Sequence, residues 1–311
     1  MLNDFNRVDN FDLKQLTTLK IGGQANISYS PISLGDMAEA IRKHHIHGEN
    51  VTILGAGSNL LISSAGIDGA VVITKNLKDV IKISENQIFA QCGAKASSLA
   101  RLAYDASLAD SEFLIGIPGS IGGAIYMNAG AHGQNVKNII EKVKIYNLST
   151  YQVEDLPLKA LEFKYRSSTF MEKGYVILSG IFNLPLGNKD KIKEKMDFHV
   201  NYRAKNHPPL TEYSAGSTFR NPEGEYAANL LEKVGAKEYI ENGRVRFSQK
   251  HANFLYNFND ATSTDVIKLM HKMRQRVYDE FGIKLHPEIK FVGKRTDEEA
   301  ELWEIMTKTK N

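Results

Sequence analysis

The chain has 311 residues, 42% of them hydrophobic, which is longer than one compact domain usually is, so we expect two or three domains. Lys and Arg total 39 against 36 Asp and Glu, and these scattered charges, with a net of +3, exclude the basic stripe of a nucleic-acid-binding protein. A single cysteine, Cys92, excludes an intramolecular disulfide. The sequence shows neither a leader nor an apolar run of about 20 residues, so we expect a soluble, cytoplasmic protein with no membrane partner. We expect no obligate protein partner either.

The first predicted element is a helix that begins at Ser33, where Asp36 completes a start signal, and stops before Gly48. A β-branched run at 51–54 predicts a strand directly after it. Further strands are predicted at 70–74, 80–83, 88–92, 143–147 and 175–182, and a shorter helix at 96–106. This irregular mixture predicts an α+β fold rather than regular alternation of strands and helices.

Three histidines, His44, His45 and His47, lie at the predicted end of the first helix. A helix C-terminus favours such residues through its dipole, and we find no carboxylate or cysteine that would complete a ligand set. We therefore expect no metal site.

The second half of the chain begins with a charged segment at 189–203 that is predicted to be helical. Lys205–Pro209 then interrupts any periodicity, which predicts the main domain boundary. Beyond it we expect a helix at 226–234 and a strand at 254–258. The clearest helix of the chain follows, preceded by Ser263 and Thr264 and ended by Gly282.

A first glycine-rich loop follows the strand at 51–54. Its residues are Gly55, Ala56, Gly57, Ser58, Asn59 and Leu60. In a dinucleotide-binding turn the position of Leu60 is a glycine that lets a helix pack closely, whereas this chain continues as a strand. The loop is equally well explained as a phosphate-binding nest of backbone amides or as a plain tight turn.

A second segment has six glycines within 116–133, interleaved with apolar residues, which is not typical of a flexible linker. Backbone that lacks Cβ can approach another group closely and can adopt positive φ. We therefore favour ligand binding over a bend packed on a strand. The candidates for contacts with a pyrophosphate beside a flat cofactor are Gly116, Ile117, Pro118, Gly119, Ser120, Gly122, Gly123 and Ala124.

The motifs of the chain, taken in order, resemble those of UDP-N-acetylenolpyruvoylglucosamine reductases. They are Thr18–Gly23, Leu54–Asn59, Gly116–Gly123, Tyr165–Ser168, Ala215–Pro222, His251–Phe254 and His286–Ile289. The resemblance runs from about Thr17 to Gly293, and this ordered succession is far more specific than any single motif. No extra insertion separates Arg166 from Ser217, so the chain is similar to the shorter, second type of the family.

This resemblance implies an FAD-binding fold of the vanillyl-alcohol oxidase (PCMH) type in two lobes, residues 1–75 and 76–203, and a C-terminal α+β substrate-binding domain, residues 204–311. It also implies noncovalent FAD held by the two glycine-rich segments, and NADPH as the hydride donor. The substrate would be a UDP-sugar whose enolpyruvyl group is reduced to give UDP-N-acetylmuramate in bacterial cell-wall synthesis.

The resemblance further implies roles for single residues. Ser217 would protonate the intermediate that follows hydride addition, while Arg166 and Glu288 would stabilise its enolate-like charge. The candidates for substrate contacts are Tyr165, Arg203, Lys205, Arg220 and Asn229. Arg220 stands where the family pattern has Lys, which preserves the charge but changes the geometry of its contacts.

Two other functions remain open at this point. A flavin oxidase of the same fold would act on an alcohol or sugar, often with covalently attached FAD, and His132 is the conceivable attachment point. A noncatalytic nucleotide-sugar sensor would bind without turnover, and the joint presence of Arg166, Ser217 and Glu288 argues against it.

Overall fold

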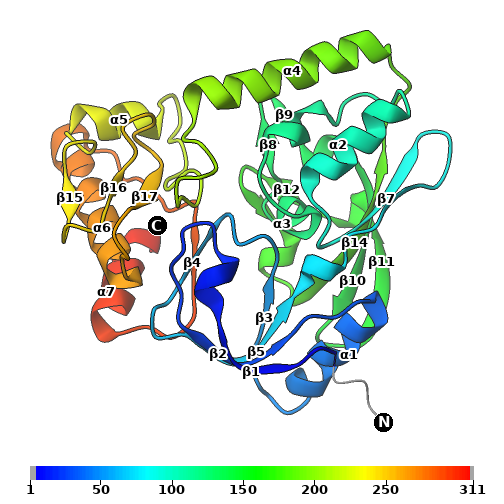
Figure 1. Ribbon diagram of the computed structural model, residues 1–311, viewed down its shortest axis with the longest axis horizontal. Coiled ribbons are helices and arrows are strands. Elements are labelled where there is room, and N and C mark those ends of the chain that lie inside the picture. Colours follow the sequence, from blue (N-terminus) through cyan, green and yellow to red (C-terminus); the bar gives the residue numbers. More distant parts are fainter. Residues whose placement is uncertain (1–4, 309–311) are drawn as a thin grey trace. The chain divides into compact units, whose positions relative to one another are not determined.

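The computed structural model describes residues 5–308, which form two compact units. Unit 1 contains residues 5–9, 27–56 and 69–205, and unit 2 contains residues 10–26, 57–68 and 206–308 (Figure 1). The first glycine-rich loop is therefore divided, because Gly55 and Ala56 belong to unit 1 and the rest to unit 2. The division into three domains at 75 and 203 stays a prediction.

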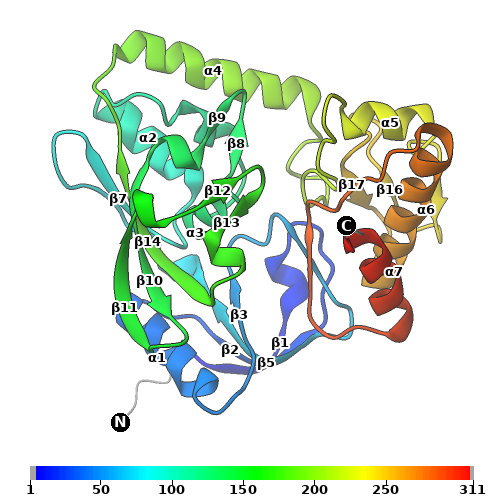
Figure 2. The same cartoon turned by 180° about the vertical axis from the view of Figure 1, so that it is seen from behind.

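The largest sheet of unit 1 is antiparallel and has the strand order β11-β10-β14-β7-β6. Its strands are β6 (Val80–Lys82), β7 (Gln87–Gln91), β10 (Ile140–Asn147), β11 (Gln152–Pro157) and β14 (Tyr175–Asn183). Helices α2 (Ala96–Asp105) and α3 (Ile121–Tyr126) pack against this sheet (Figures 1 and 2). Their contact buries the main hydrophobic core of the unit.

A second group of elements precedes that sheet in the chain. Strand β3 (Val51–Leu54) pairs in parallel with β5 (Ile67–Ile73), and α1 (Leu34–His45) packs against β3. With β1 (Val8–Asp12) and β2 (Gln24–Tyr29) they give the sheet order β1-β2-β5-β3. Ser33 Oγ accepts the Asp36 N–H at 3.0 Å, which confirms the predicted helix start. The predicted charged helix is α4 (Lys189–Asn206), slightly longer than expected.

Unit 2 contains the antiparallel sheet β15 (Ile240–Glu241), β16 (Val245–Phe247) and β17 (Leu255–Asn257), which packs against α6 (Ser263–Phe281). Helices α5 (Ala227–Lys233) and α7 (Asp297–Thr307) contact α6, and Figure 2 shows α7 beside it. A parallel pair, β4 (Leu60–Ile62) and β18 (Lys290–Val292), completes the unit. This combination of helices and mostly antiparallel strands confirms the α+β class.

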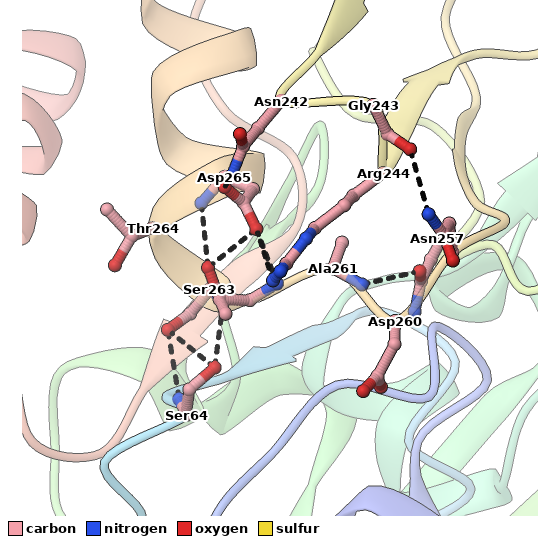
Figure 3. A network of polar contacts seen from close by, with 12 residues as sticks. Ser64, Asn242, Gly243, Arg244, Asn257, Asp260, Ala261, Ser263, Thr264 and Asp265 are labelled. Atoms are coloured by element: carbon pink, nitrogen blue, oxygen red, sulfur yellow. Dashed lines mark hydrogen bonds and ion pairs between the residues drawn. The ribbon is translucent and has the colours of Figure 1, made fainter.

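A polar network fixes the start of α6 (Figure 3). Thr262 caps the helix, because its hydroxyl accepts the Asp265 N–H and the Asp265 carboxylate accepts the Thr262 N–H. The prediction that Ser263 and Thr264 precede the helix was therefore wrong, because the capping residue is Thr262. Ser263 instead lies inside the helix, where Ser263 and Ser64 exchange N–H to hydroxyl bonds of 2.9 Å. Gly282, with φ of 68°, ends α6 as predicted.

The second glycine-rich segment was predicted as a loop, but it contains helical structure. A 3₁₀ turn at Glu112–Gly116 is followed by α3, which Ser120 caps. The Gly122 N–H donates to Cys92 C=O at 2.7 Å, and a side chain at Gly122 would crowd Cys92. The helix therefore forms because its glycines allow it to lie close to a neighbouring strand end. Short pairs not predicted are β8 (Gly130–Ala131) with β9 (Gln134–Asn135) and β12 (Phe163–Lys164) with β13 (Ser167–Ser168).

Candidate active site

The first glycine-rich loop leads from β3 to β4, and Leu60 is already the first residue of β4. Gly57 has φ of +63°, and a side chain there would overlap the backbone of Leu16, so packing within unit 2 requires glycine. A side chain at Gly55 would overlap the hydroxyl of Ser120. Gly55 therefore brings the two glycine-rich segments together inside unit 1.

Backbone donors suited to an anion lie at this meeting point. The N–H groups of Gly55, Ala56 and Ser120 have no hydrogen-bond acceptor within residues 5–308. Clustered N–H groups of this kind form anion-binding nests, so the site fits a pyrophosphate such as that of FAD. Ile117, Pro118 and Gly119 form the bend before Ser120, and Gly123 is exposed in the first turn of α3. Ala124 differs from these, because its side chain is buried in the core of unit 1.

Arg166 forms part of the tight turn between β12 and β13. Its φ is +53°, which is uncommon for a residue with a side chain and is often found at functional sites. The guanidinium donates from Nη2 to Gly130 C=O at 3.2 Å and lies 5.2 Å from the centre of the Tyr165 ring. Tyr165 itself is 54% exposed, whereas Arg166 is half-buried.

Arg203, near the end of α4, donates from Nη1 to Gly116 C=O at 3.4 Å, which links α4 to the second glycine-rich segment. Burial lowers the pKa of Arg203 below its usual range. Lys205 is exposed in the last turn of the same helix. His132, the conceivable attachment point for a flavin, is exposed and has its ring centre 4.4 Å from that of Tyr202.

In unit 2, the segment that carries Ser217 lies between two others. An antiparallel bridge joins Ser217 to Phe254 on one side, and another joins Phe219 to Pro287 on the other. The Glu288 N–H donates to Thr218 C=O at 2.8 Å. Ser217 and Glu288, both half-buried, are therefore brought onto neighbouring segments although they are distant in sequence.

The end of the first glycine-rich loop lies beside the same segments. Asn59 donates from Nδ2 to Glu288 C=O at 3.3 Å and accepts the Lys290 N–H at 3.0 Å. Gly216 approaches the backbone of Ser58. The structure thus brings Ser58, Asn59, Ser217 and Glu288 together within unit 2, whereas Arg166 belongs to unit 1.

Two cationic side chains accompany Glu288. The Arg220 N–H donates to His286 C=O at 2.9 Å, and the buried Nε of Arg220 has no partner within the described residues. Burial lowers the pKa of Lys290, the charge of Arg220 lowers it further, and Glu288 opposes the shift. The sequence analysis missed Lys290, although its position two residues after Glu288 on β18 was a signal. Asn229 is exposed on α5 and its N–H bonds to Tyr226 C=O.

His44, one of the histidines near the end of α1, and the single cysteine have the contacts of buried structural residues. His44 is buried and contacts the Tyr29 hydroxyl at 2.8 Å, and Glu49, a carboxylate that the sequence analysis overlooked, bonds to its other ring nitrogen. Burial raises the pKa of the Cys92 thiol to about 12. Within residues 5–308 no three His, Cys, Asp or Glu residues are grouped so that they could hold a metal ion. Nor does any described helix have the length and apolar character needed to cross a membrane.

Comparison with known proteins agrees with this arrangement. Residues 208–292 match the C-terminal domain of UDP-N-acetylenolpyruvoylglucosamine reductase, and residues 27–150 match an FAD binding domain. The reductase of that name from Caldanaerobacter subterraneus is 39% identical over 288 residues, 92% of this chain and 93% of its own. The one from Listeria monocytogenes is 37% identical over 284 residues, 91% of this chain and 94% of its own.

A solved structure extends the comparison to the fold. The crystal structure of the UDP-N-acetylenolpyruvylglucosamine reductase from Thermus caldophilus has a TM-score of 0.77 at 27% identity, over 92% of this chain and 98% of that chain. Together with the two domain matches, it confirms the predicted fold class, an FAD-binding part followed by a substrate-binding part.

Proposed function

This chain belongs to the family of UDP-N-acetylenolpyruvoylglucosamine reductases, and we propose that it reduces the enolpyruvyl group of that UDP-sugar to give UDP-N-acetylmuramate. FAD, when bound, supplies the hydride, which it receives from NADPH. The observation that carries the proposal is the placement of Ser217 and Glu288 on neighbouring segments of unit 2, next to Asn59 of the glycine-rich loop.

In this reaction the protein has to stabilise a developing negative charge and deliver one proton. Hydride addition to the methylene carbon leaves an electron pair on the adjacent carbon, which delocalises into the substrate carboxylate as an enolate. Glu288, protonated in the working complex, donates a hydrogen bond to this enolate, and Arg166 stabilises it through its guanidinium. The Ser217 hydroxyl then delivers the proton to carbon, which suffices because the acceptor is strongly basic and the geometry is fixed.

The remaining site residues bind rather than react. The backbone donors of the two glycine-rich segments hold the FAD pyrophosphate, as their free N–H groups suggest. Arg203, Lys205 and Arg220, with Tyr165 and Asn229, contact the UDP-sugar, or NADPH when it occupies the same site in turn. Cationic side chains suit both ligands because both carry diphosphate groups.

Ser217→Ala tests the proposal, with Ser263→Ala as a control that removes a buried hydroxyl of unit 2 at the start of α6, outside the site. We expect about one noncovalent FAD per chain, consistent with a single cofactor pocket. NADPH should bleach the flavin of Ser217→Ala at the normal rate, while reoxidation by the UDP-sugar slows by about a hundredfold or more. A colourless protein that takes up no FAD, or a covalently bound flavin reoxidised only by oxygen, would contradict the proposal.

A further inference from the structure

We infer that Asn253 is a positioning residue, whose buried side chain holds the backbone of the Ser217 segment where Ser217 can deliver its proton. The inference rests on the proposed function, in which Ser217 is the proton donor. Asn253 belongs to the motif His251–Phe254, to which the sequence analysis assigned no chemical role.

Asn253 forms three hydrogen bonds with the two residues that follow Ser217. Its Oδ1 accepts the Phe219 N–H at 2.9 Å, and its Nδ2 donates to the Phe219 C=O at 2.8 Å. Its own C=O accepts the Thr218 N–H at 2.8 Å. The hydroxyl of Ser217 forms no hydrogen bond within residues 5–308, so what it can reach depends on its own rotamer and on where the backbone of the segment lies.

The site requires an amide side chain. Asn253 is 3% exposed, and an amide offers one donor and one acceptor that match the C=O and N–H of a single residue, as a neighbouring strand would. Aspartate has no donor, so its second oxygen would face the Phe219 carbonyl, acceptor against acceptor. An unpaired buried polar group is costly, and the segment would shift to relieve it.

Such a shift would reach both reacting groups. Thr218, held by Asn253 on one side, accepts the Glu288 N–H on the other, so Ser217 and Glu288 are positioned through the same short segment. Asn253 is fixed in turn by His251, whose Nδ1 accepts the Asn253 N–H at 3.2 Å. Burial lowers the pKa of His251, which keeps that ring nitrogen available as an acceptor near neutral pH.

Unit 2 offers a matched control in Asn257, which is 2% exposed and whose amide also donates to a backbone carbonyl and accepts a backbone N–H. Its Nδ2 donates to Leu19 C=O at 3.0 Å. Its Oδ1 accepts the Ala261 N–H at 2.9 Å, as Figure 3 shows. Asn257→Asp therefore removes a buried side-chain donor of the same kind, while the backbone bond from the Asn257 N–H to Tyr213 C=O at 3.0 Å, four residues before Ser217, is kept.

The test compares the holoenzymes of Asn253→Asp and Asn257→Asp by stopped-flow absorbance of the flavin. In Asn253→Asp we expect normal reduction by NADPH and reoxidation by the UDP-sugar slowed about tenfold to a hundredfold, with a larger solvent deuterium isotope effect. In Asn257→Asp both half-reactions should run normally. Equal slowing in both variants would overturn the inference, because it would reflect general destabilisation.

A double substitution separates this inference from the proposed function. In the Ser217→Ala background, Asn253→Asp should cause less slowing than it does alone, because Ser217, one of the two groups that it positions, is gone and only Glu288 remains. Further slowing of the same size, or normal reoxidation in Asn253→Asp alone, would overturn the inference. Normal reoxidation in Ser217→Ala would instead overturn the proposed function. If Asn253→Asp does not fold, Asn253→Ser undergoes the same measurements, and undiminished reoxidation there counts against the inference.

Discussion

The substitution Gly55→Ala tests the contact between the two glycine-rich segments, which Gly55 and Ser120 form. The added methyl group would overlap the Ser120 hydroxyl, closer than real Cβ contacts come, whereas the next atom, the Cβ of Ser120, lies at an ordinary 3.5 Å. The hydroxyl must therefore rotate away. In doing so it loses the Gly123 N–H that it accepts at 3.4 Å as the cap of α3.

Two opposing terms set the size of the effect. Loss of an N-cap costs about 0.5–2 kcal/mol, and the long bond here places the loss near 1 kcal/mol. Replacing glycine restricts the unfolded chain, which stabilises by about 0.5 kcal/mol where φ is compatible, as it is at Gly55. Gly55→Ala should thus destabilise the protein by about 0.5 kcal/mol, but stabilise it by about the same amount in a Ser120→Ala background, since the overlapping hydroxyl is then absent.

Urea unfolding of the FAD-free protein measures these differences without linkage to cofactor binding. Gly35→Ala in α1 is the control, because the nearest atom to its added methyl group is Ser33 Oγ at 3.7 Å, and it should stabilise by about 0.5–1 kcal/mol. If Gly55→Ala has the same effect with and without the Ser120 hydroxyl, the contact between the two segments does not exist as described.

Three other outcomes follow from particular side chains. Glu288→Gln keeps a neutral donor and should retain faster flavin reoxidation by the UDP-sugar than Glu288→Asp, which withdraws the acid by one methylene; equal, near-normal rates would mean that Glu288 takes no part. Burial lowers the pKa of three histidines of unit 2, so below about pH 6.5 the unfolded chain binds more protons than the folded protein does. The melting temperature should therefore fall when the pH is lowered from 7.5 to 5.5, and an unchanged melting temperature would contradict this. The three histidines are His251, His271 and His286. Because burial raises the pKa of Cys92 to about 12, iodoacetamide at pH 8 should modify the unfolded but not the native protein, and rapid native labelling would show that the site opens.

Local signals in the sequence predicted much of the fold. Helices α1 and α6 lie where apolar periodicity placed them, because that signal acts within one or two turns, and α2, α4 and α5 lie close to the ranges predicted for them. The continuation of the first glycine-rich loop as strand β4, rather than as a helix, was also predicted. The α+β class followed from the irregular mixture of predicted strands and helices, and the type of FAD-binding fold followed from the resemblance of ordered motifs.

Other elements depend on contacts that periodicity does not encode. Helix α3 contains two glycines, which local propensity disfavours in a helix, and it forms because Gly122 allows a close approach to Cys92. The two-residue strands β12 and β13 are too short for a recognisable alternation, yet they hold Arg166 at positive φ. The true cap of α6, Thr262, was a local signal that the sequence analysis overlooked, because Thr262 and Asp265 have the spacing of a capping box; the bond from Ser263 to Ser64 is the contact that periodicity does not encode.

The residues of the candidate site could be predicted from the sequence, but the contacts that hold them in place could not. Motif order pointed to Ser217 and Glu288, whereas the bridges that place them side by side form between segments separated by long stretches of chain. Asn253 illustrates the difference, because its two side-chain bonds replace those of a neighbouring strand, and nothing in the letters around it distinguishes such an asparagine from a turn residue. A proton donor has to keep its hydroxyl available for the substrate, so its position has to come from the backbone. The residues that hold that backbone therefore matter to the reaction that we propose, and the structure identifies Asn253 as one of them.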